Sequence, residues 1–212
     1  MNSKNTLFSR YPALAECENE IDRALSMMLH CYMAGGKILL CGNGGSCADC
    51  EHISGELLKG FLSRRSIPTE DRRKLTDAFP DGGEIASKLQ RGISAIPLPA
   101  FSSLLTAYAN DVSPDLVYAQ LVYSLAQKND LLIGISTSGN SKNVVAAAKV
   151  AKAIGIPVIA LTGQDGGYLR AIADCTVCAP STETFMVQEY HLPIYHYLCA
   201  ELEHIAFEGG TV

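Results

Sequence analysis

The segment Lys37-Ile38-Leu39-Leu40-Cys41-Gly42-Asn43-Gly44-Gly45-Ser46 determines the fold class of this chain. Its first half is a short apolar run typical of a buried strand, and its second half is a tight glycine turn. Before it, residues 14–34 place apolar side chains at helical spacing until Gly35-Gly36 ends the pattern. After it, a second helical pattern extends to about Leu62. The predicted order is therefore helix, strand, glycine turn, helix.

The same alternation returns over the second half of the chain. Near-continuous apolar strands separated by helices predict a mostly parallel five-stranded sheet with helices on both faces, because parallel strands need crossover helices that bury them. This is a doubly wound, flavodoxin-like α/β fold. The predicted strands are 37–41, 93–98, 130–136, 156–161 and the edge strand 175–178. The later predicted helices are 102–108, 114–127, one ending at Ile154, 166–171 and 183–207.

Residues 63–90 differ in composition from the rest of the chain. They are rich in charge and in Pro, Gly and Ser, as in Arg72-Arg73-Lys74 and Pro80-Asp81-Gly82-Gly83. We interpret them as an inserted surface loop with room for a short helix. Such long loops are uncommon in compact domains, so a solvated excursion and a lid over a site both stay open. No other segment resembles a linker, and residues 1–212 are predicted to form a single domain with an N-terminal helix.

Composition and charge exclude several classes of protein. A net charge of −5 gives no general attraction to nucleic acid or anionic membranes. No run of 18 apolar residues predicts a membrane span, and residues 1–12 lack the apolar core of a signal peptide. We therefore expect a cytoplasmic protein without nucleic-acid or membrane partners. The pairs Cys47/Cys50 and Cys175/Cys178 have zinc-site spacing, but the second lies on a predicted strand, so we interpret all eight cysteines as reduced structural thiols.

Two strand-to-helix turns carry residues suited to an anion. Gly42–Ser46 allows close approach of the backbone to a ligand, and Ser136–Ser141 places hydroxyls and amides at a helix N-terminus. The partial positive charge of that helix end favours a phosphate without a lysine. A dinucleotide fingerprint would need glycine at Cys47, and a P-loop would need Gly-Lys-Ser/Thr, which is missing. Each turn alone could be a plain cap, but together they favour phosphate binding.

Several motifs in register resemble the sugar isomerase (SIS) domain family over nearly the whole chain except 63–90. Their order, with the terminal Gln188-Glu189-x-His191, is similar to the phosphoheptose isomerase branch of that family. The motifs are Cys41–Ser46, Asn110-Asp111, Ile135–Ser141 and Leu161-Thr162-Gly163-x-Asp165-Gly166-Gly167.

The resemblance implies conversion of sedoheptulose 7-phosphate to D-glycero-D-manno-heptose 7-phosphate, a precursor of cell-surface heptose. It implies Glu56 and His196 as the catalytic pair, and a zinc ion bound by His52, Glu56, Gln188 and His196. It also implies a homotetramer whose sites draw on neighbouring subunits. The implied substrate-binding residues are Asn43, Gly44, Gly45, Ser46, Asn110, Asp111, Ser136, Thr137, Ser138, Ser141 and Gln188.

The residues themselves are compatible with acid–base chemistry. His52 and Glu56 are four residues apart on a predicted helix and share a face. Moving a proton between adjacent sugar carbons needs a carboxylate to take it and an acid at the carbonyl oxygen, whereas zinc would polarise the carbonyl instead. Taken alone, Glu56 is more often a solvated helix residue and His196 a core histidine. Pro193 predicts a kink near residues 188–189, which weakens the zinc assignment.

Two other functions stay open at this stage. The first is a non-catalytic SIS protein that regulates or scaffolds, as in the replication-initiator-associating relatives, which lose the catalytic side chains. The presence of Glu56 and His196 argues against it. The second is an isomerase or etherase for another sugar phosphate, because Gly55 stands where the branch commonly has a second glutamate and residues 63–90 are inserted.

Overall fold

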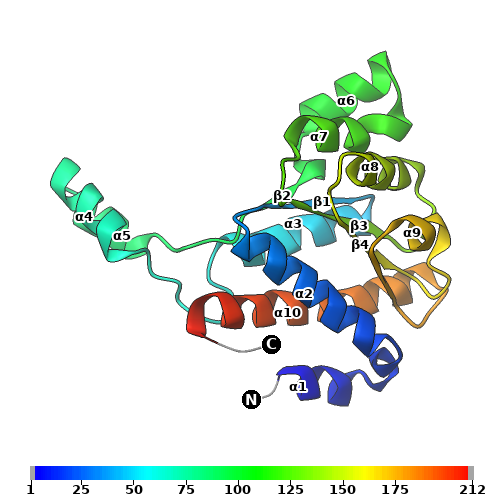
Figure 1. Cartoon of the computed structure of the whole chain (residues 1–212), viewed down its shortest axis with the longest axis horizontal. Coiled ribbons are helices and arrows are strands. Elements are labelled where there is room, and N and C mark those ends of the chain that lie inside the picture. The colour runs from blue at the N-terminus through cyan, green and yellow to red at the C-terminus, as the bar shows by residue number, and fades with distance from the viewer. Residues whose placement is uncertain (1–2, 210–212) are drawn as a thin grey trace.

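The chain folds around one parallel five-stranded sheet, which confirms the predicted fold class (Figure 1). The computed structural model describes residues 3–209; residues 1–2 and 210–212 of the predicted domain lie outside the described residues. The strand order β2-β1-β3-β4-β5 is flavodoxin-like, so ligands are expected beyond the carboxyl ends of β1 and β3. The strands are β1 (Ile38–Gly42), β2 (Ala95–Pro97), β3 (Leu131–Ser136), β4 (Val158–Thr162) and β5 (Cys175–Cys178).

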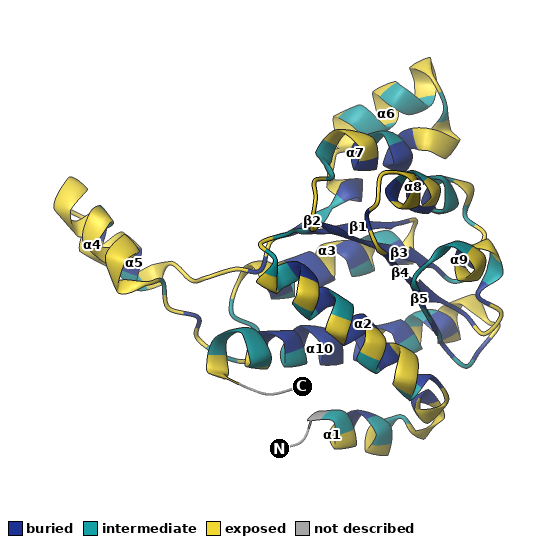
Figure 2. Ribbon diagram, in the orientation of Figure 1, coloured by how far each residue is buried: buried dark blue, intermediate teal, exposed yellow. Residues whose placement is uncertain are grey.

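Helices cover both faces of the sheet, and two separate cores hold them there (Figure 2). Alternate residues of β1 point to opposite faces, with Ile38 and Leu40 in one core and Leu39 and Cys41 in the other. The first face carries α1 (Ser3–Arg10), the 3-10 helix Pro12–Cys17, α2 (Glu18–Met33), α3 (Gly45–Leu58) and α10 (Thr184–Glu208). The second carries α6 (Ser102–Asp111), α7 (Val117–Leu125), α8 (Lys142–Ala153), α9 (Gly167–Ile172) and the 3-10 helices Leu98–Ala100 and Pro114–Leu116.

The N-terminal region is more divided than the predicted helix 14–34. Helix α1 ends at Arg10, and a separate 3-10 helix begins at Pro12, because proline has no amide hydrogen with which to continue the preceding helix. Helix α2 then runs to Met33, and Gly35 follows it in the left-handed conformation (φ +74°), as predicted for a glycine that ends a helix.

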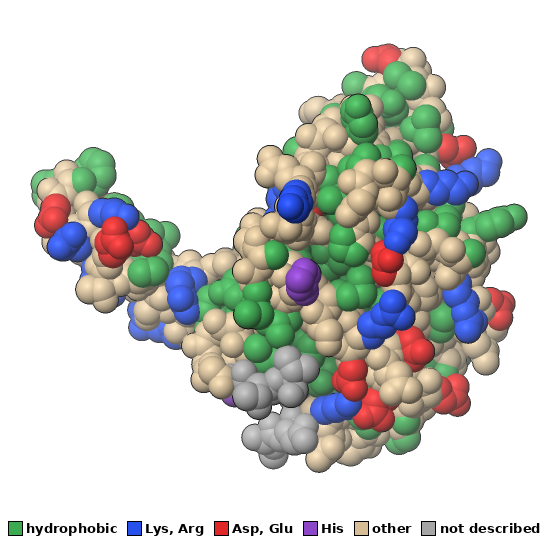
Figure 3. All heavy atoms as spheres, in the orientation of Figure 1, with side chains coloured by type: hydrophobic (Ala, Val, Ile, Leu, Met, Phe, Trp, Pro, Cys, Tyr) green, Lys and Arg blue, Asp and Glu red, His purple; other side chains and the backbone are tan. Residues whose placement is uncertain are grey.

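Residues 63–90 form a projecting arm with two helices, α4 (Thr69–Ala78) and α5 (Gly82–Lys88), where the sequence predicted a loop with one short helix (Figure 1). The two helices pack against each other at Gly82, where a β-carbon would collide with the carbonyl of Leu75. A bridge between Ser66 and Gln90 closes the base of the arm. Its exposed surface mixes hydrophobic, basic and acidic side chains (Figures 2 and 3).

Helix α10 is continuous through Pro193, although the sequence predicted a kink near residues 188–189. Its buried side chains hold it against the sheet on both sides of the proline, with Val187 and His191 before it and Ile194 and Leu198 after it. Because α10 and α3 pack against each other, successive turns of one helix face successive turns of the other.

His191 on α10 makes the stability of the fold depend on pH. Its ring is fully buried, and burial lowers its pKa to about 4, although Nε2 donates a 3.1 Å hydrogen bond to the Thr162 carbonyl. The unfolded chain binds this proton near pH 6.5. Stability from His191 is therefore complete above pH 6.5 and is lost as pH falls toward 4.

We expect protonation of His191 to lower the free energy of unfolding by about 2 kcal/mol when the pH falls from 7 to 5. Denaturant unfolding at several pH values measures this slope. In His191→Gln, whose amide can still donate to Thr162 but does not titrate, the slope should shrink by that amount. An unchanged slope in the variant would show that His191 is not the group responsible.

The cysteines have the properties predicted for reduced structural thiols. All eight are free, and six of them are buried; burial raises the pKa of Cys41 to about 12, as expected for inert structural thiols. In residues 3–209, each helix is too short or too polar to span a bilayer.

Candidate active site

The glycine turn after β1 brings backbone close to a cavity. Gly44 has φ +56° and ψ −122°, a conformation that disfavours residues with a β-carbon, and it starts α3. A β-carbon on Gly45 would collide with the side-chain amide of Gln188, so this helix end and α10 meet closely. Tyr118 donates a 2.7 Å hydrogen bond to the Gly42 carbonyl and supports the turn from beneath.

The serine-rich turn after β3 forms the opposite wall. Ser136 donates to the hydroxyl of Ser141 at 3.0 Å, and Ser141 begins α8 without capping it by its side chain. The side chains of Asn43 and Asn143 exchange two hydrogen bonds of 2.8 and 2.9 Å, which tie the glycine turn to the first turn of α8. The amides of α8 and its partial positive charge are therefore held against the glycine turn.

A cavity of about 340 Å³ lies between these two turns, a size within the usual range for small-molecule sites. No charged side chain lines it among the described residues, so an anion there would contact hydroxyls and amides. Its lining residues are Asn43, Gly44, Gly45, Ser46, Ile135, Ser136, Thr137, Ser141, Thr184 and Gln188. We call this cavity the anion cradle. A larger cavity of about 500 Å³ beside β5 contains none of the predicted site residues.

Three of the predicted substrate-binding residues lie outside the anion cradle. Ser138 lines a neighbouring cavity, and its hydroxyl accepts a 3.2 Å hydrogen bond from the Asn140 amide. Asn110 and Asp111 are exposed at the end of α6 and bond to each other at 2.8 Å. The role of Ser138 in holding the phosphate and those of Asn110 and Asp111 in lining the sugar stay predictions.

The cradle geometry predicts different effects for a serine in its wall and a serine outside it. We expect Ser141→Ala to weaken phosphate binding about tenfold or more, because it removes a hydroxyl from the cradle and hydrogen bonds to charged groups are comparatively strong. Ser103→Ala, at an exposed serine of α6 away from the cradle, is the matched control and should change affinity much less. Calorimetric titration with a sugar phosphate measures both. Equal effects of the two substitutions would contradict the assignment of the cradle wall.

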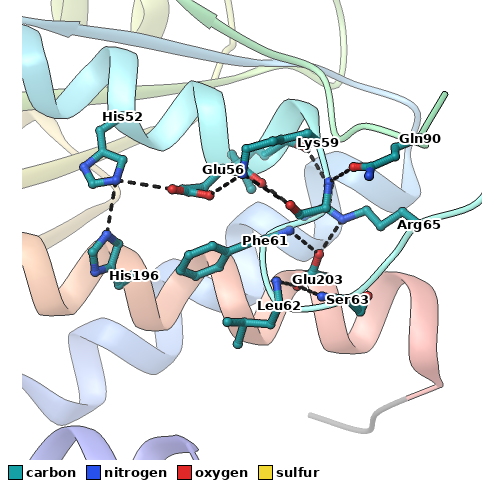
Figure 4. A network of polar contacts seen from close by, with 12 residues as sticks. His52, Glu56, Lys59, Phe61, Leu62, Ser63, Arg65, Gln90, His196 and Glu203 are labelled. Carbon is teal, nitrogen blue, oxygen red and sulfur yellow. Dashed lines mark hydrogen bonds and ion pairs between the residues drawn. The ribbon is translucent and has the colours of Figure 1, made fainter. Parts of the chain in front are cut away.

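Helices α3 and α10 bring His52, Glu56 and His196 together (Figure 4). His52 Nε2 lies 3.3 Å from Glu56 Oε1 and 3.4 Å from His196 Nε2. Glu56 Oε2 also accepts a 3.0 Å hydrogen bond from Lys59. The two predicted catalytic side chains therefore flank one imidazole, in an arrangement suited to moving protons. We call these three residues the acid–base cluster.

The environment of His196 sets its charge state. Burial lowers the pKa of His196, the nearby His52 lowers it further, and Glu56 opposes both. At neutral pH the ring is thus held neutral. A neutral imidazole can donate a hydrogen bond to a carbonyl oxygen on which negative charge develops.

The acid–base cluster and the anion cradle occupy different turns of the same two helices. Gln188 faces Gly45, whereas His196 faces His52, two helical turns and about 10 Å further along α3. His196 lines a separate groove of about 430 Å³ between α1 and α10. Within one chain, the anion cradle and His196 thus line separate cavities.

The predicted zinc site is only partly assembled. The two short separations around His52 match the roughly 3.4 Å expected between neighbouring ligands of tetrahedral zinc. Gln188, however, lies two turns away. In residues 3–209, no group of three or more His, Cys, Asp or Glu is arranged to hold a metal ion. The four predicted ligands therefore do not fit zinc as arranged in this chain.

A buried ion pair lies next to the acid–base cluster, at the end of α3 (Figure 4). Arg65 Nε donates to Glu203 Oε1 at 2.6 Å, and its guanidinium also donates to the carbonyls of Leu57 and Glu56. Glu203 further accepts from the amides of residues 61–63. Burial raises the pKa of Glu203, but these amides and Arg65 outweigh it and hold that pKa below its usual value. The network connects the end of α3, the base of the arm and α10.

Sequence reasoning did not identify several supporting residues. Asn143 lies one residue inside α8, and its position just after the serine-rich turn was the available signal. Tyr118, Asp49 and Tyr195 gave none, because each acts on a residue distant in sequence through a contact that only the fold creates.

An uncharged cavity at the switch point of a parallel sheet, with a carboxylate and two imidazoles on the neighbouring helices, defines an α/β domain suited to binding an anion and to acid–base chemistry. The SIS domain family matches residues 9–92 and 72–163. Phosphoheptose isomerase of Helicobacter hepaticus is 36% identical over 211 residues, covering 100% of this chain and 91% of the relative. That of Aliarcobacter butzleri is 38% identical over 182 residues, covering 86% and 83%.

Solved structures agree with this relationship. Phosphoheptose isomerase of Neisseria gonorrhoeae has a TM-score of 0.73 and 33% identity, over 92% of this chain and 90% of that chain. The enzyme of Francisella tularensis has a TM-score of 0.73 and 27% identity, over 96% and 100%. The chain therefore belongs to the SIS domain family, in its phosphoheptose isomerase branch.

Proposed function

We propose that this chain is an aldose–ketose isomerase that converts sedoheptulose 7-phosphate to D-glycero-D-manno-heptose 7-phosphate for cell-surface heptose synthesis. One observation carries the proposal: a phosphate cradle and a Glu56–His52–His196 cluster lie on the same two helices. The substrate likewise has its phosphate and its reacting atoms at opposite ends, since the phosphate is on C7 and the reacting carbons are C1 and C2. The named relatives support the same reaction.

The cradle would hold the phosphate through neutral groups. Ser136, Thr137 and Ser141 would donate hydroxyls, and the first amides of α8 would add the partial positive charge of the helix end. Asn43, Gly44 and Gly45 would line the adjoining part of the sugar. Fixing the phosphate would orient C1 and C2 relative to the catalytic groups.

Glu56 would act as the base of the isomerisation. Its carboxylate would take the proton from C1 of the ketose and return it to C2, while the electrons of the C1–H bond form the enediol double bond. Neutral His196 would donate from Nε2 to the carbonyl oxygen as negative charge develops there. Return of the proton to C2 and loss of the O1 proton would complete the aldose.

Zinc stays a prediction for this enzyme, and no step above passes through it. Elemental analysis of purified protein, compared with a His52→Gln variant, tests whether the cluster holds metal. About one zinc per chain that is lost in the variant would support the prediction, and equal zinc content in both proteins would contradict it.

We propose that the enzyme is a cytoplasmic homotetramer, as the family resemblance implies. Because the anion cradle and His196 line separate cavities in one chain, a site shared between subunits would bring phosphate-binding and catalytic groups together. Exposed Phe79, Ile85 and Leu89 on the arm also offer apolar surface for another subunit. Light scattering during size-exclusion chromatography tests the assembly, and a stable monomer would contradict it.

A substrate panel tests the reaction itself. Activity with sedoheptulose 7-phosphate should exceed that with fructose 6-phosphate and other ketose phosphates in kcat/KM. Preference for a different ketose phosphate would keep the isomerase mechanism and reject the heptose. Binding without turnover of any member would favour a regulatory SIS protein.

A further inference from the structure

We propose that Tyr195 is a positioning residue for this site, because its hydroxyl links the buried carboxylate of Asp49 to Nδ1 of His52 and so fixes the ring and tautomer of His52. The inference rests on the proposed function for its kinetic consequence, but its structural content can be measured independently.

The contacts form a continuous chain from the protein interior to the cluster. Tyr195 donates a 3.2 Å hydrogen bond to Asp49 Oδ1, and its oxygen lies 3.0 Å from His52 Nδ1. The rings of His52 and Tyr195 meet edge to face with centroids 5.4 Å apart. His52 Nε2 then faces Glu56 and His196.

The direction of these hydrogen bonds determines the tautomer of His52. Since the Tyr195 proton points to Asp49, the Tyr195 oxygen is free to accept, and we assign the His52 proton to Nδ1, from which it donates to Tyr195. Nε2 of His52 is then an acceptor. When Glu56 takes a proton from the substrate, its carboxyl becomes a donor toward that acceptor, which lies 3.3 Å away.

Asp49 is placed to serve this purpose. Its Oδ2 is buried without a hydrogen-bond partner, and its Oδ1 accepts a hydrogen bond from Tyr195. Burial raises the pKa of Asp49, and the hydrogen bond from Tyr195 and the proximity of His52 oppose that shift. A carboxylate kept in this environment without a second partner is costly, which points to a role beyond packing.

The ring and the hydroxyl of Tyr195 have separable roles. The ring is 2% exposed and belongs to the core formed by α2, α3 and α10. The side chain of His52 is 42% exposed, so packing alone leaves its ring free to turn. Tyr195→Phe therefore keeps the core contact and removes the hydroxyl that orients His52 and donates to Asp49.

We expect Tyr195→Phe to lower kcat about tenfold with KM nearly unchanged, because orientation of the cluster is lost while the anion cradle is untouched. Nitrogen-15 NMR of the imidazoles should show His52 as the Nδ1–H tautomer in the wild type and shifted toward Nε2–H in the variant. His52→Gln identifies the His52 signals among the five histidines. Tyr197→Phe, two residues along α10 and also buried, is the matched control and should alter neither readout.

The outcomes separate this proposal from the proposed function. An Nε2–H tautomer in the wild type, or a His52 spectrum unchanged by Tyr195→Phe, would overturn the positioning role even if the enzyme is an isomerase. Unchanged kcat with the expected tautomer shift would overturn its catalytic consequence. If the wild type turns over no heptulose phosphate, the proposed function fails, and the NMR comparison still decides the position of His52.

Discussion

Glu56→Gln is expected to reduce turnover of sedoheptulose 7-phosphate by a factor of about 10² to 10⁴, the usual contribution of a positioned general base. The amide has nearly the same shape as the carboxylate but cannot take the C1 proton. Affinity for the sugar phosphate should change little, because the anion cradle lies about three helical turns away from Glu56 along α3. Kinetics and calorimetric titration measure the two quantities separately.

Glu51→Gln is the matched control for that substitution. Glu51 is on the same helix but exposed, and it should tolerate the change with normal turnover and stability. Retained turnover in Glu56→Gln would remove Glu56 from the role of base. Loss of turnover in both variants would indicate damage to α3 rather than loss of a proton acceptor.

Glu203→Ala is expected to lower the free energy of unfolding by about 3–5 kcal/mol, because it leaves Arg65 buried without its partner. The Arg65 side chain is 0% exposed and that of Glu203 is 2% exposed, so water cannot replace the lost carboxylate. The amides of residues 61–63 also lose their acceptor. Denaturant unfolding monitored by circular dichroism measures the effect.

The same substitution should also reach the active site. Arg65 donates to the carbonyl of Glu56, so release of Arg65 loosens the end of α3 that carries the proposed base. Glu201→Ala, two residues earlier on α10, provides the control and should cost less than about 1 kcal/mol, as expected away from buried networks. A Glu203→Ala protein as stable as wild type would show that the ion pair does not anchor the arm.

The fold was predictable because its signals are local. Each apolar run between turn residues became a strand, and Gly42–Ser46 and Ser136–Ser141 became the two walls of one cavity, since carboxyl ends of neighbouring parallel strands meet at one edge. The pairing of His52 with Glu56 followed from helical spacing alone. These features depend on residues close in sequence.

The remaining features depend on contacts between distant segments. The second helix of the arm forms because Gly82 lets it approach Leu75 of the first, which composition did not indicate. Gln188 and His196 are eight residues apart in sequence. They lie in two different sites because of the way α10 packs along α3. The Asp49–Tyr195–His52 chain likewise joins residues more than 140 positions apart.

The central claim is tested most directly by a proton NMR time course of the purified protein with sedoheptulose 7-phosphate in D₂O, with and without zinc. The account predicts aldose anomeric signals and deuterium at C2 of the product, because the proton held by Glu56 exchanges with solvent. A zinc requirement would add a metal to the chemistry without removing the isomerisation. Tight binding of the sugar phosphate with no aldose formed under either condition would contradict the proposed function.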